Sequence, residues 1–558
     1  MATIPGKHAL LEQLLADGTK HIFGNPGSTE LAFMDGLQDY PQIQYMLGLH
    51  ETVAVGMADG YARATGRPSF VNLHIAPGLA NGMSMIYNAW KGGTPLVVTA
   101  GQQDTRFLLT EPLLSGDLVR LARPWTKWSG EVTRGDDIPM AMRRAFKVAQ
   151  EPPKGPVFLS IPQDVLDHPV SEPIIPTTHI SWHIRPDQEA IERAATLLAG
   201  AEHPCFLVGD QMAYAGGQAE VAALAEMVGA PIYAGSNREW NFPTNHPLYM
   251  GGFTVLEGAR EALKQYDVVM AIGTSWLFGT IWYEPGPAFP EHTQFIHIDF
   301  DSWEIGKNLP IAVGIKADPR LAAAELLESV QKKMSPAARQ AGQQRTRDLS
   351  AKKQANFERA QKRAEAEWDN KPISPWRLAA ELRDSIKPHT VFVGGGGTSA
   401  RAPISTLIDQ TEPNSFFEGG AALGFPLPGA LGVQLALPDR PVLGLLRDGD
   451  AMYSIQGLWT AAHYNIPVTY VVVNNAQYRI LKLGMVHYLG ESGRKSEFLG
   501  LDLDNPPLDY AKMCSVWGIP ATRVENPKEL GPALRDAINH NGPSLVDVVV
   551  DNAYHGYF

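Results

Sequence analysis

The sequence predicts an α/β protein built from three doubly wound, mostly parallel-sheet domains. Two observations support this fold class: apolar, β-branched runs recur along the whole chain, and amphipathic helical patterns separate them. Runs without polar alternation are typical of strands buried on both faces of a parallel sheet, and their alternation with helices is typical of doubly wound folds. The predicted strands are 69–75, 95–101, 156–162, 204–210, 267–273, 294–300, 389–395, 441–446, 468–475 and 544–550.

Two interruptions divide the 558 residues, which are too many for a single core. Residues 164–187 are rich in Pro and His and lack any period, so they predict a linker. Residues 335–370 are dense in Ala, Gln, Arg and Lys, and they predict an exposed helix that bridges two domains. The predicted domains are an N-terminal domain over 1–175, a middle domain over 185–335 and a C-terminal domain over 370–558.

The composition disfavours several classes of protein. Lys and Arg total 47 against 59 for Asp and Glu, so a net charge of -12 argues against nucleic acid or an anionic membrane as partner. Two cysteines, Cys205 and Cys514, cannot build a disulfide framework or a multi-cysteine metal cluster. The first residues lack a secretory pattern, and no apolar run is long enough to cross a bilayer. We therefore expect a cytoplasmic protein that acts on a small molecule.

Two polar residues follow predicted strands in the last third of the chain. Asp448 follows strand 441–446, and Asn475, 27 residues later, ends strand 468–475. In a parallel sheet both lie at the carboxyl edge, where open α/β folds bind ligands. Carboxylate and amide oxygens suit Mg²⁺ or Ca²⁺ carrying a diphosphate, and a helix expected after Gly449 would direct its N-terminus at phosphate oxygens. These features predict a metal–diphosphate site, whereas an Asp-Gly pair alone usually marks only a turn.

A second set of candidates lies near the N-terminus. The segment IFGNPGSTE (22–30) is a tight Gly/Pro loop that follows a strand. Glu51 opens a helix with a buried apolar face, where an acid is either a helix cap or a functional group. His74 ends strand 69–75 before an expected Gly-Pro turn, and it is either structural or catalytic.

Several longer segments carry a family resemblance. They run from GNPGSTE through PLVVTAGQQ and KGPVFLSIPQD to ALGFPLPGALGVQLALPDR and YSIQGLWTAAHYNIP, and cover nearly the whole chain. The chain thereby resembles the thiamine-diphosphate family of 2-keto-acid decarboxylases and acetolactate-synthase-like enzymes, with benzoylformate decarboxylases as the nearest branch. The resemblance implies a pyrimidine-binding, a middle and a diphosphate-binding domain, with thiamine diphosphate and Mg²⁺ (or Ca²⁺) as cofactors. It also implies a homodimer or homotetramer whose active sites lie between the first domain of one subunit and the third domain of another.

The resemblance also implies roles for individual residues. Glu51 matches the glutamate that hydrogen-bonds the aminopyrimidine ring and activates the cofactor, and Leu423 matches the apolar residue that holds the cofactor in its bent form. Ser28 and His74 match residues that face the substrate, the histidine as a proton relay. The other residues expected at the cofactor are Asn25, Pro26, Gly27, Thr398, Gly449 and Asp450, and those expected at the metal are Asp448, Asn475 and, through its carbonyl, Gln477.

The sequence departs from the family pattern at the diphosphate motif and in the middle domain. Arg447 stands where the motif normally begins with Gly, and Asp450 adds a carboxylate. The affinity for the cofactor should be lower unless Arg447 and Asp450 form an ion pair, or unless Arg447 offsets the phosphate charge. The second catalytic histidine of benzoylformate decarboxylases is missing from 275–286.

The segment 476–500 is a third departure. It has Gly484 where a bulky aromatic residue is expected, and it is several residues longer than in relatives. The smaller residue enlarges a pocket, and His487 or Glu491 would replace the missing histidine as an acid/base group. The alternative is a longer surface loop without a role in chemistry.

Three hypotheses follow for the function. The first is decarboxylation of an aryl or branched 2-keto acid to an aldehyde through a C2 ylide and an enamine, with carboligation as a possible second activity. The second keeps the cofactor but makes the chain a carbon–carbon lyase or ligase, such as a 2-hydroxyacyl-CoA lyase or an acyloin or acetolactate-type synthase. Its substrates would be aldehydes or acyl-CoA, with Glu491 as acid/base and Arg494 and Lys495 binding phosphates. The third is a non-catalytic homologue in which Arg447 prevents productive cofactor binding.

Overall fold

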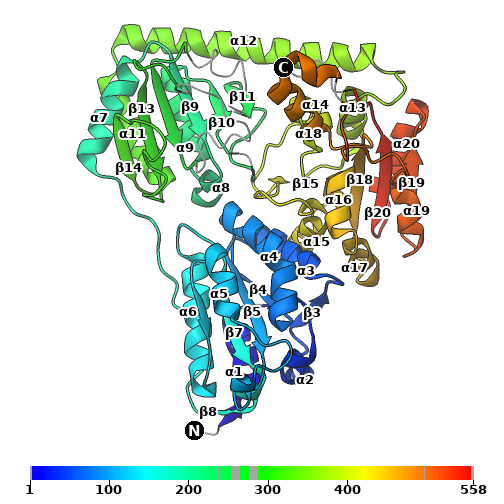
Figure 1. Cartoon of the computed structure of the whole chain (residues 1–558). Helices are drawn as coiled ribbons and strands as arrows, with labels where there is room; N and C mark the ends of the chain where they lie inside the picture. The colour runs from blue at the N-terminus through cyan, green and yellow to red at the C-terminus, as the bar shows by residue number, and fades with distance from the viewer. Residues whose placement is uncertain are drawn as a thin grey trace.

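The computed structural model describes residues 3–236, 238–252, 264–274, 287, 289–495 and 497–553, without the side chains of residues 491, 494 and 495. Within these ranges the chain forms three six-stranded sheets, each surrounded by helices (Figure 1). All pairs of neighbouring strands within the three sheets are parallel. A short antiparallel pair joins β1 (Ile4–Pro5) to β8 (Pro169–Val170). The predicted fold class is therefore confirmed.

The N-terminal sheet has the strand order β3-β2-β4-β5-β7-β6. Its strands β4, β5 and β7 are buried along their whole length, which explains why they lack polar alternation. The strands are β2 (His21–Asn25), β3 (Gln44–Leu47), β4 (Ser69–Leu73), β5 (Leu96–Gln102), β6 (Ser129–Glu131) and β7 (Val157–Pro162). The helices around it are α1 (Gly6–Ala16), α2 (Leu31–Leu37), α3 (Glu51–Thr65), α4 (Ile75–Gly92), α5 (Leu118–Ala122) and α6 (Ile138–Gln150).

The C-terminal sheet has the order β16-β15-β17-β18-β20-β19. When strands are numbered along the chain within each sheet, both terminal sheets read 2-1-3-4-6-5. Its strands are β15 (Val391–Val393), β16 (Phe416–Phe417), β17 (Val442–Arg447), β18 (Val468–Asn474), β19 (Ala521–Val524) and β20 (Ser544–Val549). Its helices are α13 (Pro375–Ser385), α14 (Gly397–Leu407), α15 (Pro426–Ala436), α16 (Asp448–Ala451), α17 (Gly457–His463), α18 (Arg479–Leu489), α19 (Tyr510–Ser515) and α20 (Pro527–Ile538).

The middle sheet has a different order, β11-β10-β9-β12-β13-β14. Numbered along the chain this is 3-2-1-4-5-6, a common strand order of doubly wound sheets. Its strands are β9 (Pro204–Val208), β10 (Ile232–Ala234), β11 (Tyr249–Gly252), β12 (Val268–Ile272), β13 (Gln294–Asp299) and β14 (Val313–Lys316). Its described helices are α7 (Gln188–Gly200), α8 (Gln211–Ala215), α9 (Gln218–Val228) and α11 (Pro319–Lys333).

One long helix, α12 (Pro336–Ala366), spans from the middle domain to the C-terminal domain along one side of the molecule (Figure 1). Ser335 caps it by accepting a hydrogen bond from the Ala338 N–H at 3.1 Å, and Pro336 occupies the first turn, where its missing N–H costs nothing. Most of its side chains face solvent, as the charged composition of this stretch predicts. Among the described residues, no helix combines the length and apolar character that a bilayer crossing requires.

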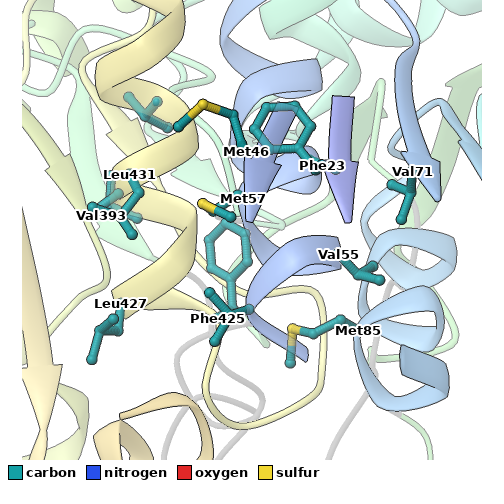
Figure 2. Close-up of a cluster of buried hydrophobic side chains, with 14 of the residues drawn as sticks. Phe23, Met46, Val55, Met57, Val71, Met85, Val393, Phe425, Leu427 and Leu431 are labelled. Atoms are coloured by element: carbon teal, nitrogen blue, oxygen red, sulfur yellow. The ribbon is translucent and has the colours of Figure 1, made fainter. Parts of the chain in front are cut away.

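The N- and C-terminal domains share a core where α3 packs against α15. Figure 2 shows part of this core, in which Val55 and Met57 from the N-terminal domain gather with Phe425, Leu427 and Leu431 from the C-terminal domain. Burying one such side chain contributes roughly 1.5–3 kcal/mol. The shared core therefore holds the two domains together as one unit.

Three local predictions were wrong in detail. The expected turn after His74 is the first turn of α4, because Pro77 lies where the helix needs no N–H donor. The segment after Asn475 is not an extended loop: α18 fills much of it, and a 3₁₀ helix, η7 (Gly490–Lys495), follows. The helix expected after Gly449 begins at Asp448 and lasts a single turn.

Candidate active site

Glu51 is the first residue of α3 and is buried. The N-cap of this helix is His50, whose ring nitrogen accepts the Thr52 N–H at 3.1 Å, so Glu51 is not needed as the cap. The Glu51 carboxylate instead accepts a hydrogen bond from the Asn25 amide at 3.2 Å and one from the Asn81 amide at 3.0 Å. The carboxylate is thus held in a fixed orientation beside the end of β2.

His74 lies between β4 and α4, and a buried acid fixes its ring. Its Nδ1 is 2.9 Å from Glu30 Oε2 and 3.2 Å from Thr29 Oγ1. Glu30 also accepts the N–H groups of Gly27 at 2.8 Å and Gly101 at 2.9 Å. Because a carboxylate only accepts, Nδ1 carries the proton, and Nε2 is the nitrogen that can exchange one.

Glu30 was missed by the sequence reasoning. The signal that could have indicated it is its position, two residues after Ser28 in the tight loop that follows β2. An acid in such a loop is usually solvated, so the sequence did not indicate that Glu30 is buried. Ser28 itself is exposed, and Asn25, Pro26 and Gly27 are half-buried. The structure therefore brings together Asn25, Glu51 and His74 with the Glu30 loop at the carboxyl edge of the N-terminal sheet.

Asp448 and Asn475 meet at the carboxyl edge of the C-terminal sheet. Asp448 Oδ2 accepts the Asn475 N–H at 3.1 Å, and Oδ1 accepts the Gly449 N–H at 2.8 Å. The Asn475 amide donates to Ser399 Oγ at 2.8 Å, and its oxygen accepts the Gln477 N–H at 3.1 Å. Burial raises the pKa of Asp448 to about 6, although these backbone donors oppose the rise.

The donor set here is chemically suited to a hard cation. It consists of a carboxylate, an amide oxygen and a main-chain carbonyl, those of Asp448, Asn475 and Gln477. The described residues contain no group of three His, Cys, Asp or Glu that could hold a metal.

A glycine-rich turn lies beside this edge. Residues 394–397 join β15 to α14, and Gly396 and Gly397 have φ of 68° and 61°, which residues with a Cβ rarely adopt. No side chain caps the N-terminus of α14. Its first N–H groups and Thr398, in the first turn, are therefore available to an anionic ligand.

Arg447 and Asp450 form an ion pair. Arg447 Nε and Nη2 donate to Asp450 Oδ2 at 3.1 and 2.8 Å, and Asp450 Oδ1 accepts the Gly424 N–H at 2.6 Å. Burial raises the pKa of Asp450, and the Arg447 charge opposes the rise. The additional carboxylate in this motif is thus neutralised inside the protein, which meets the first condition set from the sequence. The Arg447 side chain also lies against Gly397, so it borders the glycine turn.

Leu423 lies in the loop between β16 and α15 and keeps 38 % of its surface exposed. Its side chain is therefore not part of the hydrophobic core. Other exposed apolar side chains flank both candidate edges: Phe107, Leu109 and Leu113 in the N-terminal domain, and Met452, Tyr453, Ile480, Leu481, Met485 and Tyr488 in the C-terminal domain.

The remaining predicted residues are only partly described. His487 lies half-buried in α18, and Gly484 is buried in the same helix. The side chains of Glu491, Arg494 and Lys495 lie outside the described residues, as does 275–286, where the histidine is missing.

The described hydrogen bonds divide the candidates into two half-sites. Those of Glu51, His74 and Glu30 go to residues of the N-terminal domain, and those of Asp448 and Asn475 go to residues of the C-terminal domain. One half presents acid and base groups, and the other presents oxygen ligands and backbone donors.

Three family profiles match the chain. They are the thiamine pyrophosphate enzyme N-terminal TPP binding domain over residues 4–117, the central domain over 191–326 and the C-terminal TPP binding domain over 396–548. Thiamine pyrophosphate is another name for thiamine diphosphate.

Similar proteins cover nearly the whole chain. A benzoylformate decarboxylase of Pseudomonas aeruginosa is 31% identical over 549 residues, which are 97% of this chain and 98% of that protein. A probable acetolactate synthase large subunit of Methanocaldococcus jannaschii is 30% identical over 574 residues, which are 98% of this chain and 92% of that protein.

Among solved structures, a thiamine diphosphate-dependent 4-hydroxybenzoylformate decarboxylase of Rhodococcus jostii RHA1 superposes with a TM-score of 0.85 at 29% identity, covering 99% of this chain and 100% of that one. Benzoylformate decarboxylase of Polynucleobacter necessarius gives 0.84 at 27% identity, with 99% of each chain covered.

Proposed function

Because the chain belongs to the thiamine-diphosphate enzyme family, as an enzyme related to benzoylformate decarboxylase and acetolactate synthase, we propose that it decarboxylates an aryl or branched 2-keto acid to an aldehyde. Carboligation of that aldehyde would be a second activity. The observation that carries the proposal is the Glu30–His74 pair, which leaves one ring nitrogen of His74 able to exchange a proton near the exposed Ser28 hydroxyl. A decarboxylase needs such a group, because the carbon that loses CO₂ must gain a proton.

The residues of the C-terminal half-site fit the diphosphate of this cofactor. The glycine turn 394–397 and the uncapped N-terminus of α14 offer backbone N–H groups to phosphate oxygens. Asp448, Asn475 and the Gln477 carbonyl would hold Mg²⁺ (or Ca²⁺) between protein and diphosphate. The Arg447–Asp450 pair supports binding, since it places no uncompensated negative charge beside the phosphates.

Bound thiamine diphosphate supplies a nucleophilic carbon and an acceptor for the electron pair released when a bond next to a carbonyl breaks. Glu51 would hold a proton at its carboxylate and orient the pyrimidine ring, with Asn25 and Asn81 fixing its two oxygens. Ser28 would donate a hydrogen bond to the substrate carboxylate. His74 would deliver a proton from Nε2, while Glu30 holds Nδ1–H.

We also propose a homodimer or homotetramer with active sites between subunits. The N-terminal half-site carries the activating acid, and the C-terminal half-site carries the diphosphate ligands, so a complete site needs both. The exposed apolar side chains beside each half, such as Leu109 and Tyr488, support their burial against another copy.

The direct test supplies purified protein with thiamine diphosphate and Mg²⁺, and offers it a panel of aryl and branched 2-keto acids, benzoylformate first. We expect CO₂ and the corresponding aldehyde, with Glu51→Gln as the inactive control. Absence of aldehyde from every member of the panel would contradict the decarboxylase proposal. Sedimentation of the loaded protein tests the oligomer, and a strictly monomeric active enzyme would contradict shared sites.

A synthase is the second candidate, because an acetolactate synthase relative matches the chain almost as completely as the decarboxylase does. It predicts an acyloin when an aldehyde accompanies the keto acid, or a 2-hydroxy-3-keto acid when a second 2-keto acid does. Product analysis by chromatography separates the two: a synthase releases little free aldehyde. Failure of the purified protein to bind thiamine diphosphate in the presence of Mg²⁺ would instead favour the non-catalytic hypothesis.

A further inference from the structure

We propose that Asn88, held by Asp59, is a positioning residue that keeps the Leu423 loop in the place required for cofactor binding. The loop is defined as residues 418–424. The inference rests on the proposed function, in which Leu423 contacts thiamine diphosphate. The juxtaposition that carries it is a buried amide of the N-terminal domain that hydrogen-bonds the backbone on the N-terminal side of Leu423.

Asn88 reaches the loop from the last third of α4. Its side-chain oxygen accepts the Ala421 N–H at 3.0 Å and the Ala422 N–H at 3.1 Å, so both amides that precede Leu423 are fixed by one atom. Asn88 is fully buried, although the loop residues it holds are partly exposed. A buried acceptor that satisfies two loop amides is costly to lose, since both donors must then find other partners.

Asp59 decides the direction of the Asn88 amide. The Asn88 Nδ2 group donates to Asp59 Oδ2 at 2.8 Å. A carboxylate only accepts, so the amide nitrogen must face Asp59 and the amide oxygen must face the loop. Asp59 is itself fully buried and accepts from Thr94 Oγ1 at 2.7 Å, with Arg63 Nε 2.8 Å away. The orientation of Asn88 is thus set by a network that lies wholly inside the protein.

Arg63 hydrogen-bonds the first residue of the same loop. Its Nη1 donates to the Glu418 carbonyl at 2.7 Å, and its guanidinium lies 5.0 Å from the centre of the Phe425 ring, just beyond the loop. A side chain at Gly420 would collide with the Asn88 carbonyl, so this glycine permits the close approach.

The far end of the loop is fastened by the diphosphate motif. Gly424 N–H donates to Asp450 Oδ1 at 2.6 Å, and Ser454 Oγ donates to the Gly424 carbonyl at 2.7 Å. Leu423 therefore lies between an anchor from the N-terminal domain and an anchor from the C-terminal domain. Because its own side chain keeps 38 % of its surface exposed and is not part of a described hydrophobic core, the backbone anchors set its position.

The helices that carry Asp59 and Asn88, α3 and α4, also carry residues of the N-terminal half-site. Asp59 lies eight residues after Glu51 on α3, which places it roughly 12 Å along the helix axis. In an assembly with shared sites, one N-terminal domain would present Glu51 to a neighbour and hold Leu423 of its own chain. The anchoring role is therefore separable from the acid/base role.

The test compares the full-length protein with Asn88→Ala, in two measurements. The first is amide hydrogen exchange of the peptide that contains Ala421 and Ala422, followed by mass spectrometry without added cofactor. The second is the dissociation constant of thiamine diphosphate at saturating Mg²⁺, from calorimetry. We expect exchange of the two amides to accelerate by about tenfold or more, and the dissociation constant to rise by about tenfold or more.

A second variant and a control guard against simple misfolding. Gly420→Ala pushes the loop off Asn88 without changing the buried network, and it should give the same two signatures. Ser69→Ala removes a comparable buried hydrogen bond, from Ser69 Oγ to the Ala58 carbonyl at 2.8 Å, and it should change neither measurement.

The outcomes separate this inference from the proposed function. Unchanged exchange or unchanged cofactor affinity in folded Asn88→Ala and Gly420→Ala proteins would overturn the positioning role and leave the function intact. Equal changes in amide exchange and in cofactor affinity in Ser69→Ala would also overturn the positioning role, because the effect would then be general destabilisation. If the unaltered protein bound no thiamine diphosphate, the proposed function would fail first.

Discussion

The N- and C-terminal domains have sheets of the same strand order, yet they present opposite chemistry at the same edge. After the third strand of each sheet along the chain comes His74 in one domain and Asp448 in the other. In the N-terminal domain, side chains orient other side chains: Glu30 hydrogen-bonds His74, and two side-chain amides hydrogen-bond Glu51. In the C-terminal domain, backbone N–H groups and glycines shape the edge around Asp448.

The difference teaches how one topology serves two purposes. A group that exchanges protons needs a partner that fixes its tautomer, and a side-chain carboxylate supplies that partner. A metal–diphosphate site needs close approach and a fixed negative charge, which backbone donors and glycines allow. The comparison therefore predicts that variants of Glu51 and Glu30 in the N-terminal half-site reduce turnover, whereas variants of the oxygen ligands in the C-terminal half-site reduce cofactor affinity.

The largest effect is expected for Glu51→Gln. The amide keeps the size and burial of the side chain but cannot take up a proton, so kcat should fall by about 10²- to 10⁴-fold. The dissociation constant of thiamine diphosphate should change little. Initial rates on the best 2-keto acid and calorimetry measure the two quantities, and Asp35→Asn, at an exposed acid of the same domain, serves as control. Weaker binding of thiamine diphosphate with an unchanged kcat would contradict the assignment of turnover to the N-terminal half-site.

The corresponding variant in the C-terminal half-site is Asp448→Asn. Loss of the carboxylate should raise the dissociation constant of thiamine diphosphate with Mg²⁺ by about 10- to 100-fold. Turnover at saturating cofactor should fall less than in Glu51→Gln. A titration of Mg²⁺ at fixed thiamine diphosphate checks this, and wild-type affinity in the variant would remove Asp448 from the metal site.

A smaller effect is expected for Glu30→Gln. The neutral amide no longer defines Nδ1 of His74 as the protonated nitrogen, so kcat/KM should fall by about tenfold. Cofactor affinity should stay as it is. Thr29→Val removes the hydroxyl that donates to Glu30 at 2.7 Å but keeps the carboxylate, and it should lose less activity. Equal losses in both variants would assign the effect to loop packing rather than to the acid.

The smallest effect on activity is expected at Asp299, which ends β13 in the middle domain. Like Asp448 it is a buried acid at a strand end, and burial raises its pKa to about 7 although the Gln211 amide opposes the rise. A raised folded pKa means that its stabilising contribution is present at acidic pH and is lost as the pH rises through about 7.

Asp299→Asn should therefore be more stable than the wild type at pH 8, by roughly 1–3 kcal/mol, and nearly equal to it at pH 4, close to the 3.8 of an unperturbed aspartate, because the raised pKa costs stability only above that value. Thermal melts at the two pH values measure this, and cofactor affinity should be unchanged. A loss of cofactor affinity as large as that of Asp448→Asn would show that strand-end acids in general, not the C-terminal half-site, control binding.

Much of the fold could be predicted because its signals are local. Each predicted strand has a counterpart, since a run such as 468–475 is apolar for the same reason that β18 is buried on both faces. The meeting of Asp448 with Asn475 was also predictable, because consecutive strand ends of a parallel sheet share an edge. The domain boundaries and the roles of the site residues stay predictions.

Long-range pairing was not predictable. Nothing near Asn88 in the sequence indicates that it holds Ala421, more than three hundred residues away. The sequence does not predict the helix α18 in the segment after Asn475, where Gly484 and Gly490 disfavour a helix. Glu30 was overlooked since a loop acid is usually solvated, and only folding shows the donors that surround it.

By itself, then, the sequence determined the α/β class, ten of the strands and the residue types available at the two sheet edges, because burial and backbone geometry leave periodic traces along the chain. Tertiary structure alone decided which distant groups became partners: Glu30 with His74, and Asn88 with the Leu423 loop. Hydrogen bonds and ion pairs between distant segments depend on distances of a few ångströms, and those distances exist only after the domains have packed.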